Sequence, residues 1–194
     1  MAILLLDSSN TSLSVGFENN GVLIGFTSYE AWQVQSEHMV PEIDKLMGKL
    51  GLSRKDITKV VASIGPGSYT GVRIALTIAK ITALACNAPI YPVSSLRVLK
   101  DNDKPSICVI NARSNRSYFG VYKGNEIIIS DTIKTNDEVK EYIVNHKDYS
   151  ICGDARYLGF ENNDTNICKQ MVSLLGVLEK APNDLAVKPV YMKD

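Results

Sequence analysis

Histidine is nearly absent from this chain, and no metal-binding pattern of histidines occurs in it. The 194 residues include two histidines, His38 and His146, and neither H-x-x-x-H nor H-E-x-x-H is present. A local zinc or iron site on a helix requires two histidines on one face, one turn apart. The sequence therefore excludes a zinc or iron pair of that kind, and it assigns no metal ligand and no catalytic residue.

The chain also has no excess of charge of either sign. Lysine and arginine together number 21, as do aspartate and glutamate, so the formal net charge is zero. Binding to nucleic acid without sequence preference depends on neutralising phosphates with basic side chains. The balance therefore argues against a module that binds tRNA directly, while it leaves room for a weak or partner-assisted contact.

Paired cysteines and long apolar runs are missing as well. Cys86, Cys108, Cys152 and Cys168 lie far apart and form no C-x-x-C pair, which favours reduced, buried thiols over a disulfide framework. The apolar run at residues 2–6 is short and has no basic flank, unlike a signal peptide. No window approaches the roughly 20 apolar residues that span a bilayer, so we expect a cytoplasmic protein without membrane contact.

What the chain does contain is the composition of a folded protein, with 45% hydrophobic and 22% charged residues. Apolar and alternating runs predict strands, and apolar residues three and four apart predict helices. Asn20 and Gly21 accept positive φ and predict a hairpin turn. In the first half we expect strands at 3–6, 12–18, 22–29, 59–64 and 90–93, helices at 36–50 and 69–87, and a short helix ending near residue 100.

The second half repeats this element order without repeating the residues. We expect strands at 107–110, 117–123, 126–130 and 150–152, and helices at 136–146 and 166–178. The polar stretch from Asp101 to Pro105 is the best candidate for a boundary. The sequence therefore predicts an α/β protein of two related lobes with mixed sheets, residues 1–102 and 103–194.

The first motif is the polar turn that follows the first strand. Asp7, Ser8, Ser9 and Asn10 open a tight connection between two predicted strands. An aspartate there can hold a hydrated Mg²⁺, and the hydroxyls and amides after it can contact a phosphate. The alternative is that small polar residues simply satisfy the backbone of the turn. The sequence leaves both interpretations open.

The second motif is a glycine-rich loop between a strand and a helix. It consists of Gly65, Pro66, Gly67, Ser68, Tyr69, Thr70 and Gly71. Backbone N–H groups at a helix N-terminus can bind an anion, and Ser68 or Thr70 can cap the helix. The spacing is neither G-x-x-x-x-G-K-S/T nor G-x-G-x-x-G. The glycines can instead serve to let the loop pass close to another backbone.

The third feature is the pair of predicted helices in the first half. The helix at 36–50 has a broad apolar face, and the helix at 69–87 is apolar nearly all round. A helix of the second kind must be covered on more than one side. It is therefore either fully internal or part of a subunit interface, and the pattern alone does not decide between these.

Four segments together resemble a known family, the bacterial TsaB proteins. They read L-L-L-D-S-S-N-T-S-L-S-V, S-E-H-M-V-P-E-I, S-I-G-P-G-S-Y-T-G-V-R-I and A-K-I-T-A-L-A, all within residues 1–95. The end of the chain, K-P-V-Y-M-K, resembles the family's P-V-Y-L-R. The resemblance implies the two-lobe actin-like, Hsp70-like (ASKHA) fold, a duplicated ribonuclease-H-like unit. It also implies an accessory role in making threonylcarbamoyladenosine in tRNA.

The resemblance carries further expectations about sites. The turn at residues 7–10 occupies the place of a phosphate loop, functional or vestigial, and Asn111 stands where relatives often have aspartate. The two helices build a helical-bundle interface with a second copy or with TsaD, the catalytic paralogue. Carried over by motif, the interface residues are His38, Met39, Ile43, Leu46, Met47, Arg73, Ile74, Ile78 and Ala79.

These expectations combine into a hypothesis of function. The chain is a non-catalytic scaffold that dimerises with the TsaD-like paralogue and stabilises or activates it, forms a homodimer when alone, and meets tRNA only indirectly. By family analogy a TsaE-like ATPase is a further partner. The chain itself requires no cofactor, although ATP or ADP with Mg²⁺ is possible in the complex. The alternative is an ATP-dependent enzyme of actin-like fold, a small-molecule kinase or a peptidase-like hydrolase.

Overall fold

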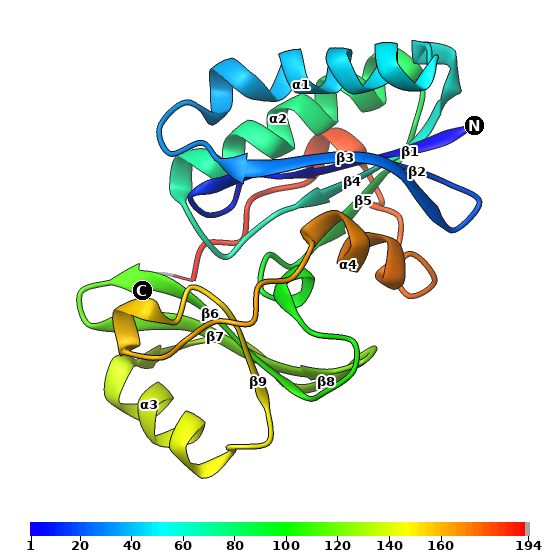
Figure 1. Ribbon diagram of the computed structural model, residues 1–194. Helices are drawn as coiled ribbons and strands as arrows, with labels where there is room; N and C mark the ends of the chain where they lie inside the picture. Colours follow the sequence, from blue (N-terminus) through cyan, green and yellow to red (C-terminus); the bar gives the residue numbers. More distant parts are fainter. Residues whose placement is uncertain (193–194) are drawn as a thin grey trace.

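The computed structural model describes residues 1–192 and has two lobes, each built on a mixed sheet (Figure 1); Lys193 of the C-terminal motif lies outside the described residues. The first sheet has the order β3-β2-β1-β4-β5 and the second the order β8-β7-β6-β9. The strands are β1 (Ala2–Asp7), β2 (Ser12–Asn19), β3 (Val22–Glu30), β4 (Ile57–Ser63), β5 (Ile90–Val93), β6 (Ser106–Arg113), β7 (Arg116–Lys123), β8 (Glu126–Thr135) and β9 (Ser150–Gly153).

The two sheets share one pattern of connections. In the first, β1 pairs antiparallel with β2 and parallel with β4. In the second, β6 pairs antiparallel with β7 and parallel with β9. The helices are α1 (Gln35–Leu50), α2 (Tyr69–Cys86), α3 (Asn136–Asn145) and α4 (Ile167–Leu174). The predicted repeat of element order and the mixed sheets are therefore confirmed.

Residues that adopt positive φ determine where the first strands turn and where α1 ends. Asn20 and Gly21 both have positive φ, 52° and 81°, so the β2–β3 hairpin turns as the sequence predicts. Gly51 ends α1 in the left-handed conformation, with φ of 64°. Pro41 lies inside α1, beyond its first turn. It is exposed, so the carbonyl that loses its helical partner there faces solvent.

One face of the first sheet is covered by α1 and α2 (Figure 1). Leu4 and Leu6 of β1 and Val60 of β4 point to this side, where Ala75 and Ala79 of α2 are buried with them. Small residues four apart let a helix lie close to its neighbour, as the sequence suggests. By length and composition alone α2 would also cross a membrane, but in this fold its buried side belongs to the core of the first lobe.

The other face of the first sheet is covered by α4, although α4 follows the second sheet in the chain. Met171 and Leu174 of α4 share a buried cluster with Leu5 of β1 and Val61 of β4. The segment after α4 stays with the first lobe, since Val190 N–H donates to Ile64 O at 2.7 Å. The predicted boundary between lobes at residue 102 therefore does not describe the whole chain, because residues from about 167 on pack against the first sheet again.

A buried lysine lies where the connection between the sheets meets α4. Lys100 is 1% exposed, and its ammonium donates to Asn102 Oδ1 at 2.5 Å and to Gln170 Oε1 of α4 at 3.4 Å. Burial, with the charge of Arg97 acting in the same direction, lowers the pKa of Lys100. These bonds tie the connection to the helix that covers the first sheet.

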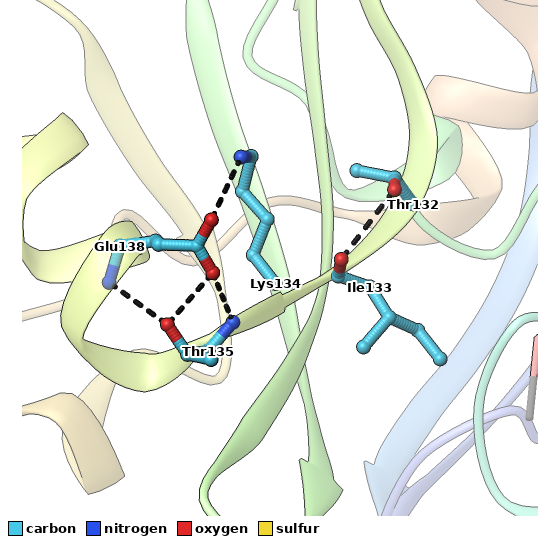
Figure 2. A network of polar contacts seen from close by, with 5 residues as sticks. All are labelled: Thr132, Ile133, Lys134, Thr135 and Glu138. Carbon is cyan, nitrogen blue, oxygen red and sulfur yellow. Dashed lines mark hydrogen bonds and ion pairs between the residues drawn. The ribbon is translucent and has the colours of Figure 1, made fainter.

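Two elements of the second half have other bounds than the sequence predicts. Strand β8 continues past Ser130 to Thr135, and α4 ends at Leu174 rather than near residue 178. Figure 2 shows what ends β8: Glu138 accepts the Thr135 N–H at 2.8 Å and its hydroxyl at 2.7 Å. Thr135 Oγ1 in turn accepts the Glu138 N–H at 3.3 Å. This capping box starts α3 directly at the last residue of the strand.

The packing of α4 on the first sheet gives a prediction of stability. Met171 is fully buried between α4 and the first sheet, so Met171→Ala should lower the free energy of unfolding by about 2 to 5 kcal/mol. Val144→Ala, at a side chain that is 53% exposed, should change it by less than about 0.5 kcal/mol. Urea unfolding followed by circular dichroism measures both. A Met171 variant as stable as the wild type would contradict the assignment of α4 to this core.

Candidate functional site

A polar cleft of about 530 Å³ lies between the two lobes. Its first-lobe wall is the turn after β1, with Asp7, Ser9 and Asn10, and its second-lobe wall includes Asp154 and Arg156 after β9. The structure therefore brings the polar turn of the first half next to the end of a parallel strand of the second half. The glycine loop, Gly65–Gly71, lies behind this turn rather than in the lining of the cleft.

Asp7 is enclosed at the end of β1. It is 1% exposed, and Ser9 donates to it through its hydroxyl, at 2.8 Å from Oδ1, and through its N–H, at 3.4 Å from Oδ2. Burial raises the pKa of the Asp7 carboxyl above its ordinary 3.8, and hydrogen bonds from Ser9 lower it by less. The carboxyl group of Asp7 is thus held by Ser9 of its own turn.

The glycine loop makes close backbone contact with that turn. A Cβ on Gly67 would lie 2.2 Å from Ser9 O, and a Cβ on Gly71 would lie 1.9 Å from Ser8 O. Only glycine permits these approaches, because Cβ atoms do not come so near to a carbonyl oxygen. Ser68 N–H donates to Ser9 O at 2.7 Å, and Ser8 Oγ donates to Gly71 O at 2.7 Å. The loop therefore clamps the turn.

Some N–H groups of the glycine loop donate to acceptors within the protein. Gly65 N–H donates to Ser95 Oγ at 3.0 Å, and Gly71 N–H donates to Ser68 Oγ at 3.2 Å, so Ser68 caps α2 as predicted. Gly65 and Pro66 are joined by a cis peptide bond. With the bond from Ser68 N–H to Ser9 O, three of the six N–H groups of the loop donate within the protein. Of the two roles that the sequence left open, the geometry favours the close approach of two backbones.

The charged side chains of the cleft show whether its lining suits the phosphate chain of a nucleotide. Its lining includes the carboxyl groups of Asp7, Glu30, Asp154 and Asp164 and one guanidinium, that of Arg156. Burial raises the pKa of Asp154. A polyphosphate would meet more negative than positive side chains there, and Asp7 is already bonded by Ser9. The residues present do not fit a nucleotide phosphate chain. Within residues 1–192, no group of three or more histidine, cysteine or acidic side chains is placed to hold a metal ion.

The turn between β6 and β7 uses Asn111 as a hydrogen-bond acceptor. Arg113, Ser114 and Asn115 all have positive φ, between 50° and 66°. Asn111 Oδ1 accepts the N–H of Arg113 at 2.8 Å, and a carboxylate oxygen would accept it as well. Asn111 therefore supplies the same kind of acceptor as the aspartate that the family resemblance implies at this position.

A second concavity, of about 460 Å³, lies between α1 and α2; we call it the helix groove. It is lined by Ser36, Val40, Tyr69, Thr70, Arg73, Ile74, Thr77 and Ile78. Arg73 is exposed, and its Nη1 donates to the hydroxyl of Tyr69 at 2.6 Å. The groove combines isoleucine and valine side chains with hydroxyls and one cation, and it lies on the outer side of the helix pair.

The residues expected at an interface fall into two groups. Met39, Leu46 and Ala79 are buried in the core of the first lobe, so they support the helix pair from beneath. The second group is half-buried or exposed and consists of His38, Ile43, Met47, Arg73, Ile74 and Ile78. His38 Nδ1 lies 3.0 Å from the hydroxyl of Tyr29. Three of this group line the helix groove: Arg73, Ile74 and Ile78.

Sequence reasoning missed the most exposed apolar side chains of the helix pair. Val40 on α1 is 56% exposed, and Ile81 and Leu84 on α2 are 63% and 74% exposed. Arg73, Thr77, Ile81 and Leu84 are spaced three or four residues apart, and this spacing places them on one face of α2. This spacing did not single out the exposed face, because α2 is apolar on nearly every side.

The clamp on the turn predicts an unusual pair of glycine substitutions. Gly71→Ala should lower the free energy of unfolding by more than about 2 kcal/mol, because its Cβ would overlap Ser8 O. Gly48→Ala in α1 should raise it by about 0.5 to 1 kcal/mol, because a Cβ there meets nothing within 4 Å and alanine favours the helix. Thermal unfolding of both variants gives the comparison. Equal effects at the two positions would contradict the clamp.

The enclosed carboxyl of Asp7 predicts a pH dependence. A raised pKa means that ionising Asp7 opposes folding, so its unfavourable contribution grows as the pH rises from about 4 through the raised pKa. Asp7→Asn should therefore be more stable than the wild type at pH 7, and this advantage should shrink as the pH falls toward 4. The control is Asp148→Asn, at an exposed carboxyl. Unfolding free energies between pH 4 and 8 measure the difference, and a constant difference would contradict the enclosure.

Comparison with known proteins agrees with this architecture. The family model described as "TsaD: tRNA N6-adenosine threonylcarbamoyltransferase" matches residues 25–183. The protein of Bacillus subtilis named "tRNA threonylcarbamoyladenosine biosynthesis protein TsaB" is 29% identical over 177 residues, which cover 89% of this chain and 75% of that protein. The Escherichia coli protein of the same name is 27% identical, over 79% of this chain and 69% of that protein.

Among solved structures, YeaZ from Pseudomonas aeruginosa superposes with a TM-score of 0.79 at 19% identity, covering 98% of this chain and 99% of that chain. This likeness extends over both sheets and shows that the expected actin-like, two-lobe α/β fold is correct. The matched residues run from β3 to the segment after α4. The chain belongs to the TsaD family, and within it resembles the TsaB proteins.

Proposed function

We propose that this chain is a non-catalytic accessory subunit in the biosynthesis of threonylcarbamoyladenosine in tRNA, and that it acts in the cytoplasm. The names of its curated relatives support the pathway. In this proposal the chain binds the TsaD-like catalytic paralogue through the helix groove and the exposed sides of α1 and α2. It thereby stabilises or activates the subunit that modifies tRNA.

The observation that carries the proposal is the uncovered side of the helix pair. The second lobe and α4 lie on the opposite side of the first sheet (Figure 1). Val40, Ile81 and Leu84 are therefore left without a covering element of this chain. Exposed apolar side chains mark a surface for another protein. Of these three, Val40 lines the helix groove, and Leu84 lines a separate concavity with Asn183 and Leu185. A partner there would bury them together with the half-buried Ile74 and Ile78.

The other parts of the proposal follow from the same surface. The isolated chain forms a homodimer, because a second copy can cover the same apolar side chains as the paralogue does. By analogy with the family, a TsaE-like ATPase is a further partner. The paralogue binds tRNA, so this chain contacts tRNA only indirectly. The zero net charge of the chain supports this indirect contact with tRNA.

We assign no reaction to the cleft between the lobes. Two features support the absence of a reaction there: Asp7 is enclosed, and carboxyl groups outnumber cations in the lining. ATP or ADP with Mg²⁺ belongs, in this proposal, to the joint surface with the paralogue and not to this chain alone. The competing function is an ATP-dependent kinase or hydrolase that uses Asp7 to hold a metal ion. ATP turnover by the purified chain that disappears in Asp7→Ala would overturn our proposal in its favour.

The proposal predicts the effect of a charge on the exposed side of α1. Val40→Glu should raise the dissociation constant for the TsaD-like paralogue at least about tenfold, because a charged group would replace an apolar side chain that the partner buries. The matched control is Val144→Glu on α3, since Val144 is 53% exposed and Val40 56%. It should bind like the wild type. Val40 is preferred to Ile43 and Ile78, which are half-buried, so that both variants remain folded.

Isothermal titration calorimetry with the paralogue, and sedimentation velocity of the chain alone, measure the two associations. The proposal is wrong if the wild-type chain is a monomer that also fails to bind the paralogue. It is equally wrong if Val40→Glu binds both partners as the wild type does.

A further inference from the structure

The chain leaves the first lobe through the connection between β5 and β6, residues 94–105, which begins with two serines bonded to opposite lobes. Ser94 Oγ donates to Asp131 Oδ2 of β8, in the second lobe, at 2.6 Å. Ser95 is bonded to Gly65 of the glycine loop, in the first lobe: its N–H donates to Gly65 O at 2.9 Å, and its Oγ accepts the Gly65 N–H at 3.0 Å. Successive residues of the connection are therefore fixed to different lobes.

The same arrangement recurs at Lys100 and Asp101. Lys100 Nζ donates to Gln170 Oε1 of α4, which covers the first sheet, at 3.4 Å. Asp101 Oδ2 accepts the Ser150 hydroxyl of β9, in the second sheet, at 2.9 Å. Although the two charged residues are adjacent in the sequence, they form no ion pair with each other within residues 1–192. Each of them holds one lobe instead.

The chain returns to the first lobe through residues 154–166, and this connection is bonded to the outgoing one. Thr165 Oγ1 donates to Leu99 O at 2.7 Å, and Asn163 Nδ2 donates to Asp101 Oδ2 at 2.8 Å. Leu99 and Thr165 both line the polar cleft between the lobes. The two connections are thus cross-linked at the cleft, and neither can change its path without breaking these bonds.

We propose that residues 94–101 form a brace that holds the two lobes at one angle and the polar cleft at one width. Lobes close around a ligand when a few residues of their connections change φ and ψ. In this chain the residues at both ends of the brace are bonded to both lobes, so such a change would break bonds at either end. Ser95 and Lys100 are 0% and 1% exposed, so water cannot replace a bond that breaks there.

The brace goes beyond the proposed function and does not depend on it, since none of residues 94–101 lines the helix groove. It does bear on the competing function. An ATP-dependent enzyme that closes its lobes on a nucleotide needs a connection that can move. A braced cleft stays open at one width, with or without ATP and Mg²⁺ in solution.

The test measures the distance between the lobes of the full chain by double electron–electron resonance. Nitroxide labels are attached at Lys55→Cys in the first lobe and Asp148→Cys in the second, both exposed positions. Cys86→Ser removes the partly exposed thiol, and the other three cysteines are buried. Dilution with unlabelled chain removes distances between copies. The otherwise unaltered chain should give one narrow distribution, which ATP and Mg²⁺ leave unchanged.

Ser95→Ala combined with Lys100→Met removes the side-chain bonds from the brace to Gly65 and Gln170. The distance distribution should widen to at least about twice its original width. Lys104→Met is the matched control, because Lys104 is an exposed lysine of the same connection; it should leave the width unchanged.

Melting temperatures show whether each variant is folded. Thr165→Val gives a second test with little change of shape, because it removes the hydroxyl that bonds to Leu99 O and keeps a side chain of similar volume; it should widen the distribution as well.

The inference is overturned by any of three results: a broad or two-peaked distribution in the unaltered chain, a distribution that shifts when ATP and Mg²⁺ are added, or folded variants of the brace whose distributions stay as narrow as that of the control. Failure of the chain to bind the paralogue would overturn the proposed function and would leave these distances as they are.

Discussion

The contact between the backbone of the glycine loop and the turn after β1 is the constraint on which both surfaces of the first lobe depend. Ser68 N–H and Ser8 Oγ bond across it, and Gly67 and Gly71 allow it. On one side of this contact lies the polar cleft with Asp7. On the other side α2 begins, so the contact also sets the position of Tyr69 and Arg73 at the helix groove. A single local arrangement thus fixes the wall of the cleft and the start of the interface helix.

Much of the fold could be predicted because its determinants are local. The hairpin at Asn20 and Gly21, the end of α1 at Gly51 and the cap of α2 at Ser68 are each encoded within a few residues. The return of residues 167–191 to the first lobe could not be predicted in this way. Nothing in the sequence of α4 distinguishes one sheet from the other, because the choice depends on which apolar face remains uncovered.

The candidate sites were predictable to different degrees. The sequence located the glycine loop but left two roles open for it, because the role depends on the backbone that lies opposite, which is 63 residues away in the sequence. It located the helix pair but not its outer side, since α2 is apolar nearly all round. Met39 and Ala79 thus seemed equivalent to Val40 and Leu84, although the fold buries the first two and exposes the others.

The return of the chain to its first lobe has a consequence for its synthesis. Strand β5 ends at Val93, whereas the helix that covers the second face of its sheet ends at Leu174. About 80 residues must still be translated between these points, which takes roughly 4 to 16 seconds at about 5–20 residues per second. Throughout that interval the nascent first sheet carries Leu5 and Val61 toward solvent. The half-made protein on the ribosome therefore exposes apolar surface that the finished protein buries, and such surface promotes aggregation.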